Sequence, residues 1–191
     1  MKAQQTWEKL LDETERLIKE KGCQKTTLKD IMERTGLTKG GIYHYVESKN
    51  ELFAQLMSRG LRSANERFYE AAGDKERPEL DSPLRQTLDT FHFDEEDVSK
   101  EIFLYLISQR HDSKVAELLQ EHHQSAFQQS KQWIEFGKEH GVIGPHVDAE
   151  KVSELFLLIG YGMNMYHAVS KEPVAMKQEE LFHYMKRLLA P

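Results

Sequence analysis

Apolar residues recur along this chain of 191 residues at intervals of three and four, the spacing of an α-helix that buries one face. Alternation with a period of two, which indicates half-buried strands, is scarce, and only five prolines interrupt the pattern. Clusters of glycine, proline, aspartate and serine separate the periodic segments. We therefore predict an all-α protein, with helices over residues 6–21, 28–35, 39–46, 49–72, 113–140, 149–170 and 175–189, and two more that begin near residues 81 and 99.

The stretch Thr26 to Glu51, TTLKDIMERTGLTKGGIYHYVESKNE, predicts two short helices joined by a tight turn and followed by a third. Thr27 can cap the first helix, and Gly36 supplies the left-handed residue that ends it. Thr38 can cap the second helix. The sequence S-K-N-E forms a capping box that begins the third helix at Lys49. This spacing is that of a helix-turn-helix.

The exposed face of the second helix is predicted to carry the chemistry. Two glycines in a helix cost roughly 1 kcal/mol each relative to alanine, and close approach of the backbone to DNA would offset that cost. The alternative is that the glycines only end a loop and the tyrosine is half-buried. The side chains and bare positions expected on this face are Lys39, Gly40, Gly41, Tyr43 and His44.

Three motifs, TTLKDI, GLTKGGIYHYV and SKNELF, resemble the DNA-binding domain of TetR-type one-component transcriptional repressors. The resemblance covers about residues 6–57, and beyond them only the helical architecture. It departs from the family pattern at Gly41, where many relatives have Thr, Ser or Ala, and before the first helix, where only Lys2 could serve as a basic arm. The resemblance implies phosphate contacts from Thr27, Tyr43 and Lys49, and places Thr38, Lys39, Gly41 and His44 nearest to the bases.

The resemblance also implies two domains and a dimer. We expect a DNA-binding domain over residues 1–48 and a helical ligand-binding and dimerisation domain over 49–191. Residues 149–170 are apolar around nearly the whole circumference of their helix, which favours pairing across a dimer interface. Together with the last helix they would form a four-helix interface between two chains. A dimer would let two recognition helices reach successive major grooves, about 34–36 Å apart.

The function expected from these features is that of a homodimeric repressor bound to an inverted-repeat operator and released by a small-molecule effector. Repression rather than activation is implied by the resemblance alone. No cofactor and no metal ion are expected. Candidate pocket residues, each aromatic having core packing as its alternative, are Phe91, Phe103, His122, Phe127, Trp133, Tyr166 and His167.

The net charge of −6 changes this picture little, because the charge is unevenly distributed. Residues 1–60 carry 11 Lys and Arg against 9 Asp and Glu, a balance of +2, so the remainder carries −8. The acidic part would lie away from the DNA. Cys23 is the only cysteine, which excludes an intramolecular disulfide and favours an inert thiol in a reducing interior. The chain shows no signal peptide or membrane span, so we expect it in the cytoplasm.

Two other classes of function are alternatives to this one, an all-helical enzyme and a module that binds only proteins. A di-iron enzyme would need two Glu-x-x-His motifs, and only Glu180 to His183 matches. His122 and His123 diverge by about 100° on a helix and cannot bind one ion together. No enzyme motif is present, so we expect no catalysis. A module that binds only proteins would explain the helices but not the outward glycines beside Lys39.

Overall fold

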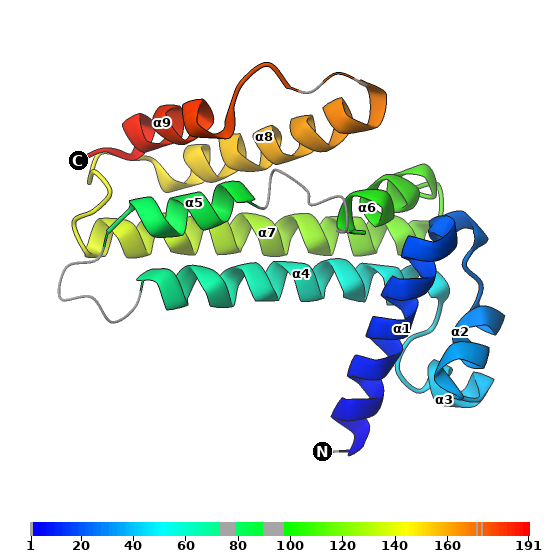
Figure 1. Cartoon of the computed structure of the whole chain (residues 1–191). Helices are drawn as coiled ribbons and strands as arrows, with labels where there is room; N and C mark the ends of the chain where they lie inside the picture. Colours follow the sequence, from blue (N-terminus) through cyan, green and yellow to red (C-terminus); the bar gives the residue numbers. More distant parts are fainter. Residues whose placement is uncertain (1, 73–78, 90–97, 171, 173) are drawn as a thin grey trace. The chain divides into compact units, whose positions relative to one another are not determined.

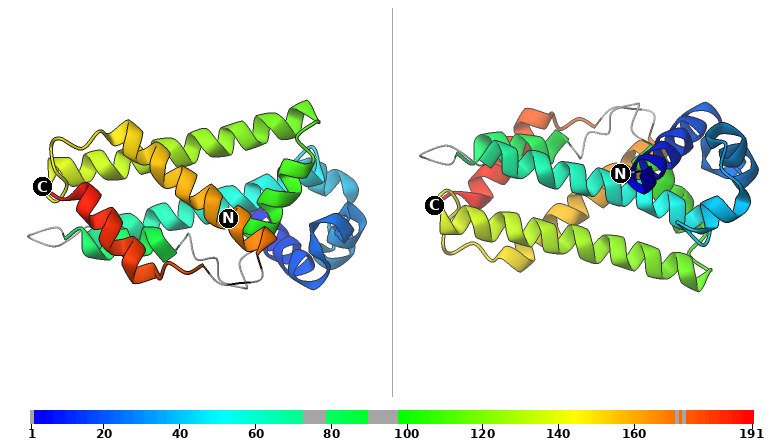
Figure 2. Two further views of the ribbon diagram at one scale, coloured as in Figure 1. Left: turned by 90° about the horizontal axis from the view of Figure 1, so that it is seen from above. Right: turned by 90° about the horizontal axis from the view of Figure 1, so that it is seen from below.

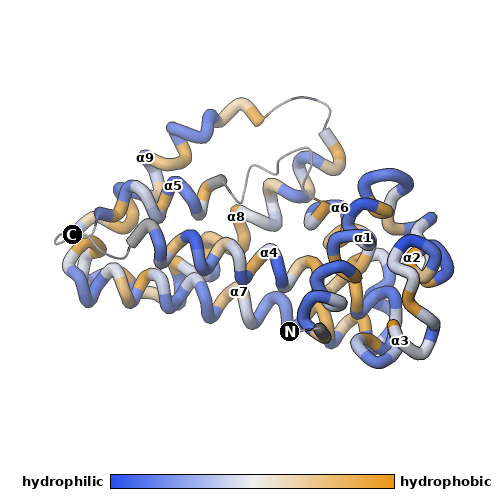
Figure 3. The backbone as a smooth tube through the Cα atoms, turned by 60° about the horizontal axis from the view of Figure 1, so that its bottom comes forward, coloured by the Kyte–Doolittle hydropathy of each residue, from blue (hydrophilic) through white to orange (hydrophobic). Residues whose placement is uncertain are grey.

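The computed structural model describes residues 2–72, 79–89, 98–170, 172 and 174–191 (Figure 1). Every regular element among these residues is an α-helix, which confirms the all-α prediction. Apolar and polar positions alternate in short bands along the helices (Figure 3), as expected of helices that bury one face. The helices are α1 (Lys2–Lys25), α2 (Leu28–Thr35), α3 (Lys39–Tyr43), α4 (Lys49–Ala72), α5 (Asp81–Asp89), α6 (Ser99–Ser108), α7 (Ser113–Glu139), α8 (Ala149–Val169) and α9 (Gln178–Leu189).

Two helices differ from the predicted bounds at ends where local hydrogen bonds decide the boundary. Helix α3 ends at Tyr43 and not near Val46, because the N–H groups of both Tyr45 and Val46 turn back to the carbonyl of Ile42. Helix α9 begins at Gln178 and not near residue 175, because the N–H of Lys177 donates to the Glu180 carboxylate, 2.8 Å away.

Helix α1 is longer than the predicted helix over residues 6–21 at both ends. It is nevertheless interrupted directly after the predicted end, at Gly22. Gly22 has φ 80°, outside the helical region, and interrupts the helix there. The left-handed backbone favours glycine at this position.

The chain folds as two compact units. The first comprises Met1–Gly60 and Asp94–His122, and the second comprises Leu61–Phe93 and His123–Pro191. Helices α4 and α7 each contribute to both units. The compact unit around the helix-turn-helix also includes α6, so it is larger than the DNA-binding domain predicted over residues 1–48. The boundary of that domain after residue 48 stays a prediction.

The core of the first unit lies under α1 to α4. Buried side chains from α6 and the start of α7, among them Ile102, Leu106 and Val115, join it. On the surface, Arg59 of α4 binds Asp12 at 2.7 Å and Glu15 at 2.6 Å. Acidic residues on the surface of α1 therefore hold α4 in place.

The second unit has its core between α5, α7, α8 and α9. Figure 2 shows α5 beside α9. Arg85 of α5 binds Glu179 of α9 through two N–H donors, at 2.7 and 2.8 Å, and its guanidinium lies 3.9 Å from the ring centroid of buried Phe182. Lys186 of α9 pairs with Asp81 at the start of α5 at 2.6 Å. Two ion pairs therefore fasten α5 to α9.

Candidate nucleic-acid interface and interior cavity

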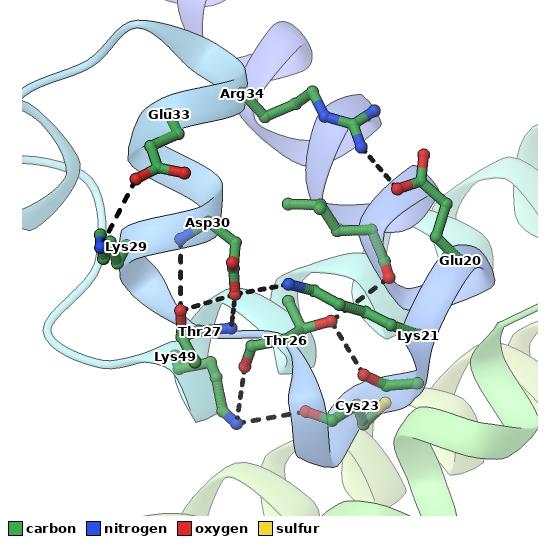
Figure 4. Close-up of polar contacts among 12 residues, drawn as sticks. Glu20, Lys21, Cys23, Thr26, Thr27, Lys29, Asp30, Glu33, Arg34 and Lys49 are labelled. Atoms are coloured by element: carbon green, nitrogen blue, oxygen red, sulfur yellow. Dashed lines mark hydrogen bonds and ion pairs between the residues drawn. The ribbon is translucent and has the colours of Figure 1, made fainter.

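Helix α2 is fixed at its start by a reciprocal cap (Figure 4). Thr27 Oγ1 accepts the N–H of Asp30 at 3.2 Å and donates its own proton to Asp30 Oδ2 at 2.6 Å. The Lys21 ammonium lies 2.7 Å from the same carboxylate, and its hydrogen bond, with that of Thr27, holds the pKa of Asp30 well below its usual range. The predicted cap is confirmed, and the hydroxyl proton that a phosphate would receive is already used.

The ammonium of Lys49 also has internal partners (Figure 4). It donates to the carbonyl of Cys23 at 3.2 Å and to that of Thr26 at 3.0 Å. It also lies 4.9 Å from the ring centroid of Tyr105 in α6. Two of its three donors therefore hold the turn before α2 against α4.

Cys23 is buried in this turn. Its N–H donates to Glu101 Oε1 of α6 at 2.7 Å. Burial, followed by the charge of Glu101, raises the pKa of the Cys23 thiol to about 12. The thiol is therefore protonated at neutral pH, as the expectation of an inert cysteine requires.

Helix α3 presents its polar side to solvent. Thr38 caps it as predicted, with Oγ1 accepting the N–H of Gly41 at 3.1 Å. Ile42 is buried, whereas Tyr43 is 44% exposed and its ring lies 5.6 Å beneath the Lys39 ammonium. Gly40 and Gly41 are part of the helix and do not end a loop, and Tyr43 is not buried. The exposed positions are Thr38, Lys39, Gly40, Tyr43 and His44, with Gly41 half-buried.

The two glycines of α3 have no internal reason to be glycine. Neither has a left-handed backbone. A Cβ on Gly40 would meet no atom within 4 Å, and one on Gly41 would lie 3.3 Å from Thr38 Oγ1, a contact that a small shift relieves. The missing side chains therefore suit a partner that approaches from outside the chain.

An interior cavity lies within the second unit. Its aromatic walls are Phe68 of α4, Trp133 and Phe136 of α7, and Phe156 of α8. The rings of Phe68 and Trp133 are stacked, with centroids 4.4 Å apart and planes 8° apart. The cavity is partly open to solvent and has a volume of about 40 Å³. Its described walls come from five helices of the second unit, α4, α5, α7, α8 and α9, and from the connections before α5 and after α7.

The predicted pocket residues overlap with the lining of this cavity only in part, and their role in binding a ligand stays a prediction. Trp133 lines the cavity, but Phe127 does not. Phe103 packs against the core of the first unit, and Tyr166 is 36% exposed. Phe91 lies outside the described residues. The two histidine candidates, neither of which lines the cavity, are half-buried: His122 and His167.

The sequence reasoning missed Phe68, Phe136 and Phe156 as cavity residues. Their spacing along each helix shows only that they face inward. A cavity forms where helices far apart in sequence leave a gap, and no pattern within one helix reports that gap.

Helix α8 carries an exposed apolar seam, defined here as Leu155, Leu158, Gly162, Met165 and Val169. Its four side chains are 41, 61, 49 and 75% exposed, in that order, and a Cβ on Gly162 would meet nothing within 4 Å. The seam alternates steps of three and four, the repeat of helices that pair with another helix. Such a surface favours a partner helix over water.

Two kinds of feature, a membrane-spanning helix and a metal-binding cluster, are absent from the described residues. None of the described helices combines the length and the apolarity that a bilayer crossing requires. The described part of the chain also contains no group of three or more His, Cys, Asp and Glu residues placed to hold a metal ion.

The helix-turn-helix matches that of a known protein family. Residues 10–56 match the family described as bacterial regulatory proteins, tetR family. The uncharacterized HTH-type transcriptional regulator YfiR of Bacillus subtilis strain 168 is 24% identical over 191 residues, covering 94% of this chain and 90% of YfiR.

Solved structures share the fold. Salmonella enterica GusR has a TM-score of 0.68 at 21% identity, covering 96% of this chain and 95% of GusR. Bacillus subtilis FadR, solved in complex with stearoyl-CoA, has a TM-score of 0.65 at 16% identity, covering 96% of this chain and 97% of FadR. Residues 10–56 therefore form a helix-turn-helix domain of the tetR family of bacterial regulatory proteins.

Proposed function

We propose that this regulator is a homodimeric repressor that binds an inverted-repeat operator and leaves it when a small molecule occupies the cavity of the second unit. The observation that supports this most directly is the exposed side of α3, where Lys39, Tyr43 and His44 surround Gly40. Repression by release from DNA is typical of the family. A repressor acts on the chromosome, so we propose the cytoplasm as its location. We also propose that the protein is a regulator without catalytic activity.

At the DNA, we propose that α3 lies in the major groove. Lys39 and His44 are exposed and carry the donors that base edges accept, and Thr38 lies beside them at the cap. Gly40 and Gly41 would let the backbone approach closely. Tyr43 is the proposed phosphate contact with the fewest internal ties, because the hydroxyl of Thr27 and the ammonium of Lys49 already have partners.

The seam of α8 supports the dimer. Leu158 and Val169 are exposed large apolar side chains at positions that a second copy of α8 would cover. Tyr184 and Leu188 of α9 are also exposed, 60 and 41%, at a spacing of four. A two-fold axis through such a surface would pair like with like and bring two copies of α3 to one inverted repeat.

The cavity supports control by a ligand. FadR, which shares the fold, binds stearoyl-CoA. In this chain α4 begins at Lys49 beside the helix-turn-helix, and Phe68 near its other end lines the cavity, so one helix carries both. A ligand shifts the protein from its DNA-binding state only through its preference for the other state, and a 100-fold preference corresponds to roughly 2.7 kcal/mol.

The test is fluorescence anisotropy with DNA from immediately upstream of the gene, across a salt series. Wild-type protein should bind this DNA more tightly than a random duplex, with affinity that falls steeply as salt rises. The variant Tyr43→Phe loses only a hydroxyl, and we expect roughly tenfold weaker binding, the value of one hydrogen bond to a charged group.

The matched control is Tyr69→Phe, which removes the same hydroxyl from Tyr69 of α4, a 36% exposed residue outside both α3 and the proposed dimer surface. Its affinity should equal that of wild type. An unchanged affinity in Tyr43→Phe would remove Tyr43 from the interface, and equal affinity of wild type for upstream and random DNA would contradict a nearby operator.

A further inference from the structure

We infer that the ligand of the cavity is a small, uncharged compound with an aromatic ring, and that it binds by widening the cavity. This inference rests on the proposed function, of which it names the ligand class. It follows from the side chains that line the cavity, the polar groups already engaged there, and the volume.

The lining has little to offer a charged ligand. No lysine, arginine or histidine is among the described residues that line the cavity, so an anion would lose its hydration without gaining a counter-charge. Among the described lining residues Glu79 is the single ionisable one, and it is exposed. A pair between a cation and an exposed carboxylate contributes little. Both signs of charge are therefore disfavoured.

Two hydrogen-bonding groups of the cavity lining have partners within the chain. Trp133 Nε1 donates to Asn65 Oδ1 at 2.9 Å, and Thr87 Oγ1 donates to the carbonyl of Pro83 at 3.0 Å. The flat faces of Phe68 and Trp133 remain as the larger recognition surface. Such faces favour a ring through offset or edge contacts.

The volume shows that binding must move a wall. A cavity of about 40 Å³ has room for a few water molecules, whereas one that accepts benzene measures about 150 Å³. Two walls resist displacement. Helix α5 is fastened to α9 by Arg85 and Lys186, and Ile143 packs so closely on Gly137 that an added Cβ would lie 2.5 Å from it.

Phe68 is the wall we expect to give way. Its ring packs against the rings of Trp133, 4.4 Å away, and Tyr69, 5.4 Å away between centroids, and such ring contacts are easier to rearrange than the ion pairs that hold α5. A ring that enters beside Trp133 would therefore displace Phe68, and with it this part of α4. The indole of Trp133 would report the event.

The experiment uses three probes that share one ring: benzyl alcohol, benzoate and benzylammonium. They are titrated into the Trp7→Phe variant, in which Trp133 is the remaining tryptophan of two. We expect saturable change in fluorescence with benzyl alcohol, and binding at least roughly tenfold weaker for both ions, because an unpaired charge must be buried. Benzyl alcohol should also weaken DNA binding in the anisotropy assay.

A matched pair of variants locates the site. Ser130 is buried in the lining, so Ser130→Leu should fill the cavity and weaken benzyl alcohol at least tenfold. Ser125→Leu makes the same change at an exposed position of α7 and should bind as wild type. Ser130→Ala, which adds no bulk, should keep binding, and an unchanged DNA affinity of unliganded Ser130→Leu would show that its loss of ligand binding is not misfolding.

Benzoate or benzylammonium binding as tightly as benzyl alcohol would overturn the uncharged class. So would a response that Ser130→Leu leaves intact. If no probe alters Trp133 while the protein still binds its upstream DNA, the ligand class is wrong and the repressor stands. Failure of the unliganded protein to bind that DNA would instead overturn the proposed function.

Discussion

Single residues of α3 carry a cost that the fold does not explain. Gly40 lies in a helix, has an ordinary backbone, and has open space where a Cβ would stand. Alanine would make a better helix there. When an exposed residue is worse for the fold than its simplest replacement, its role lies in what touches it from outside.

Gly40→Ala is therefore expected to have opposite effects on folding and on DNA binding. Stability should rise by up to about 1 kcal/mol, because alanine loses less backbone entropy than glycine in a helix. Affinity for the upstream DNA should fall about tenfold, because the new methyl group would stand between the backbone and the groove. Urea unfolding and anisotropy measure the two effects.

Gly60→Ala is the control for this substitution. Gly60 is an exposed glycine of α4, where a Cβ would make an ordinary contact of 3.6 Å with Ser99 Oγ. It should gain stability and keep its DNA affinity. If Gly40→Ala also keeps its affinity, the glycine is incidental to DNA recognition.

Lys49 shows how the role of a residue can be hidden from sequence. Its place in the motif implies a phosphate contact, and its position at the start of α4 is as predicted. Its ammonium, however, meets two carbonyl groups from residues 23 and 26, which no local pattern places beside it. The motif thus identified an important lysine, and the packing showed a structural task for it.

Among the elements, α2 depends on a charged cap. The pKa of Asp30 is lowered chiefly by its hydrogen bonds to Lys21 and Thr27. Since the folded pKa lies below the unfolded one, the carboxylate stabilises the fold above the ordinary pKa of 3.8, and this stabilisation is lost as the pH falls through the folded value.

The variant Asp30→Asn should therefore flatten part of the pH dependence of stability. At neutral pH it should unfold at a lower urea concentration than wild type, and the difference should shrink steadily as the pH is lowered below 3.8. Circular dichroism in urea at several pH values measures this. Glu33→Gln, at an exposed pair whose atoms are 3.8 Å apart, is the control. A difference that stays constant with pH would contradict the role assigned to the Asp30 charge.

Helix boundaries were predictable where side chains cap them and not where the backbone decides. Thr27 and Thr38 start helices as predicted, and Asp148 starts α8 in the same way, because each is a residue type whose oxygen accepts a free N–H. The early end of α3 results from a tightened turn on Ile42, which is compatible with several sequences. The cap before α4 is mixed: Glu51 N–H donates to Ser48 Oγ, but the Glu51 carboxylate accepts from Glu47.

At the scale of the whole molecule, the dimer can be tested at the seam. Leu158 is 61% exposed, so Leu158→Glu should leave the protomer folded while placing a charge in the proposed interface. We expect monomers at concentrations where wild type is dimeric, and weaker operator binding because only one α3 would be engaged. Sedimentation equilibrium and anisotropy measure both.

Gln132→Glu adds the same charge at an exposed position of α7 and should remain dimeric. If Leu158→Glu sediments with the mass of wild type, the seam is not the interface. The apolar helix over 149–170 was predictable from composition, whereas its pairing with a second copy stays a prediction. The cavity was not, because Phe68, Trp133 and Phe156 meet only after three helices have packed.

The unit that contains the helix-turn-helix is assembled from two stretches of chain, and this limits how such proteins can recombine. Ile102 and Leu106 of α6, and Val115 of α7, are part of its core. A genetic exchange that joined residues 1–60 to a different sensor would discard these side chains and expose the surface they cover. A viable chimera must inherit residues 98–122 together with residues 1–60. Each of these two stretches therefore needs its own breakpoint in the chain.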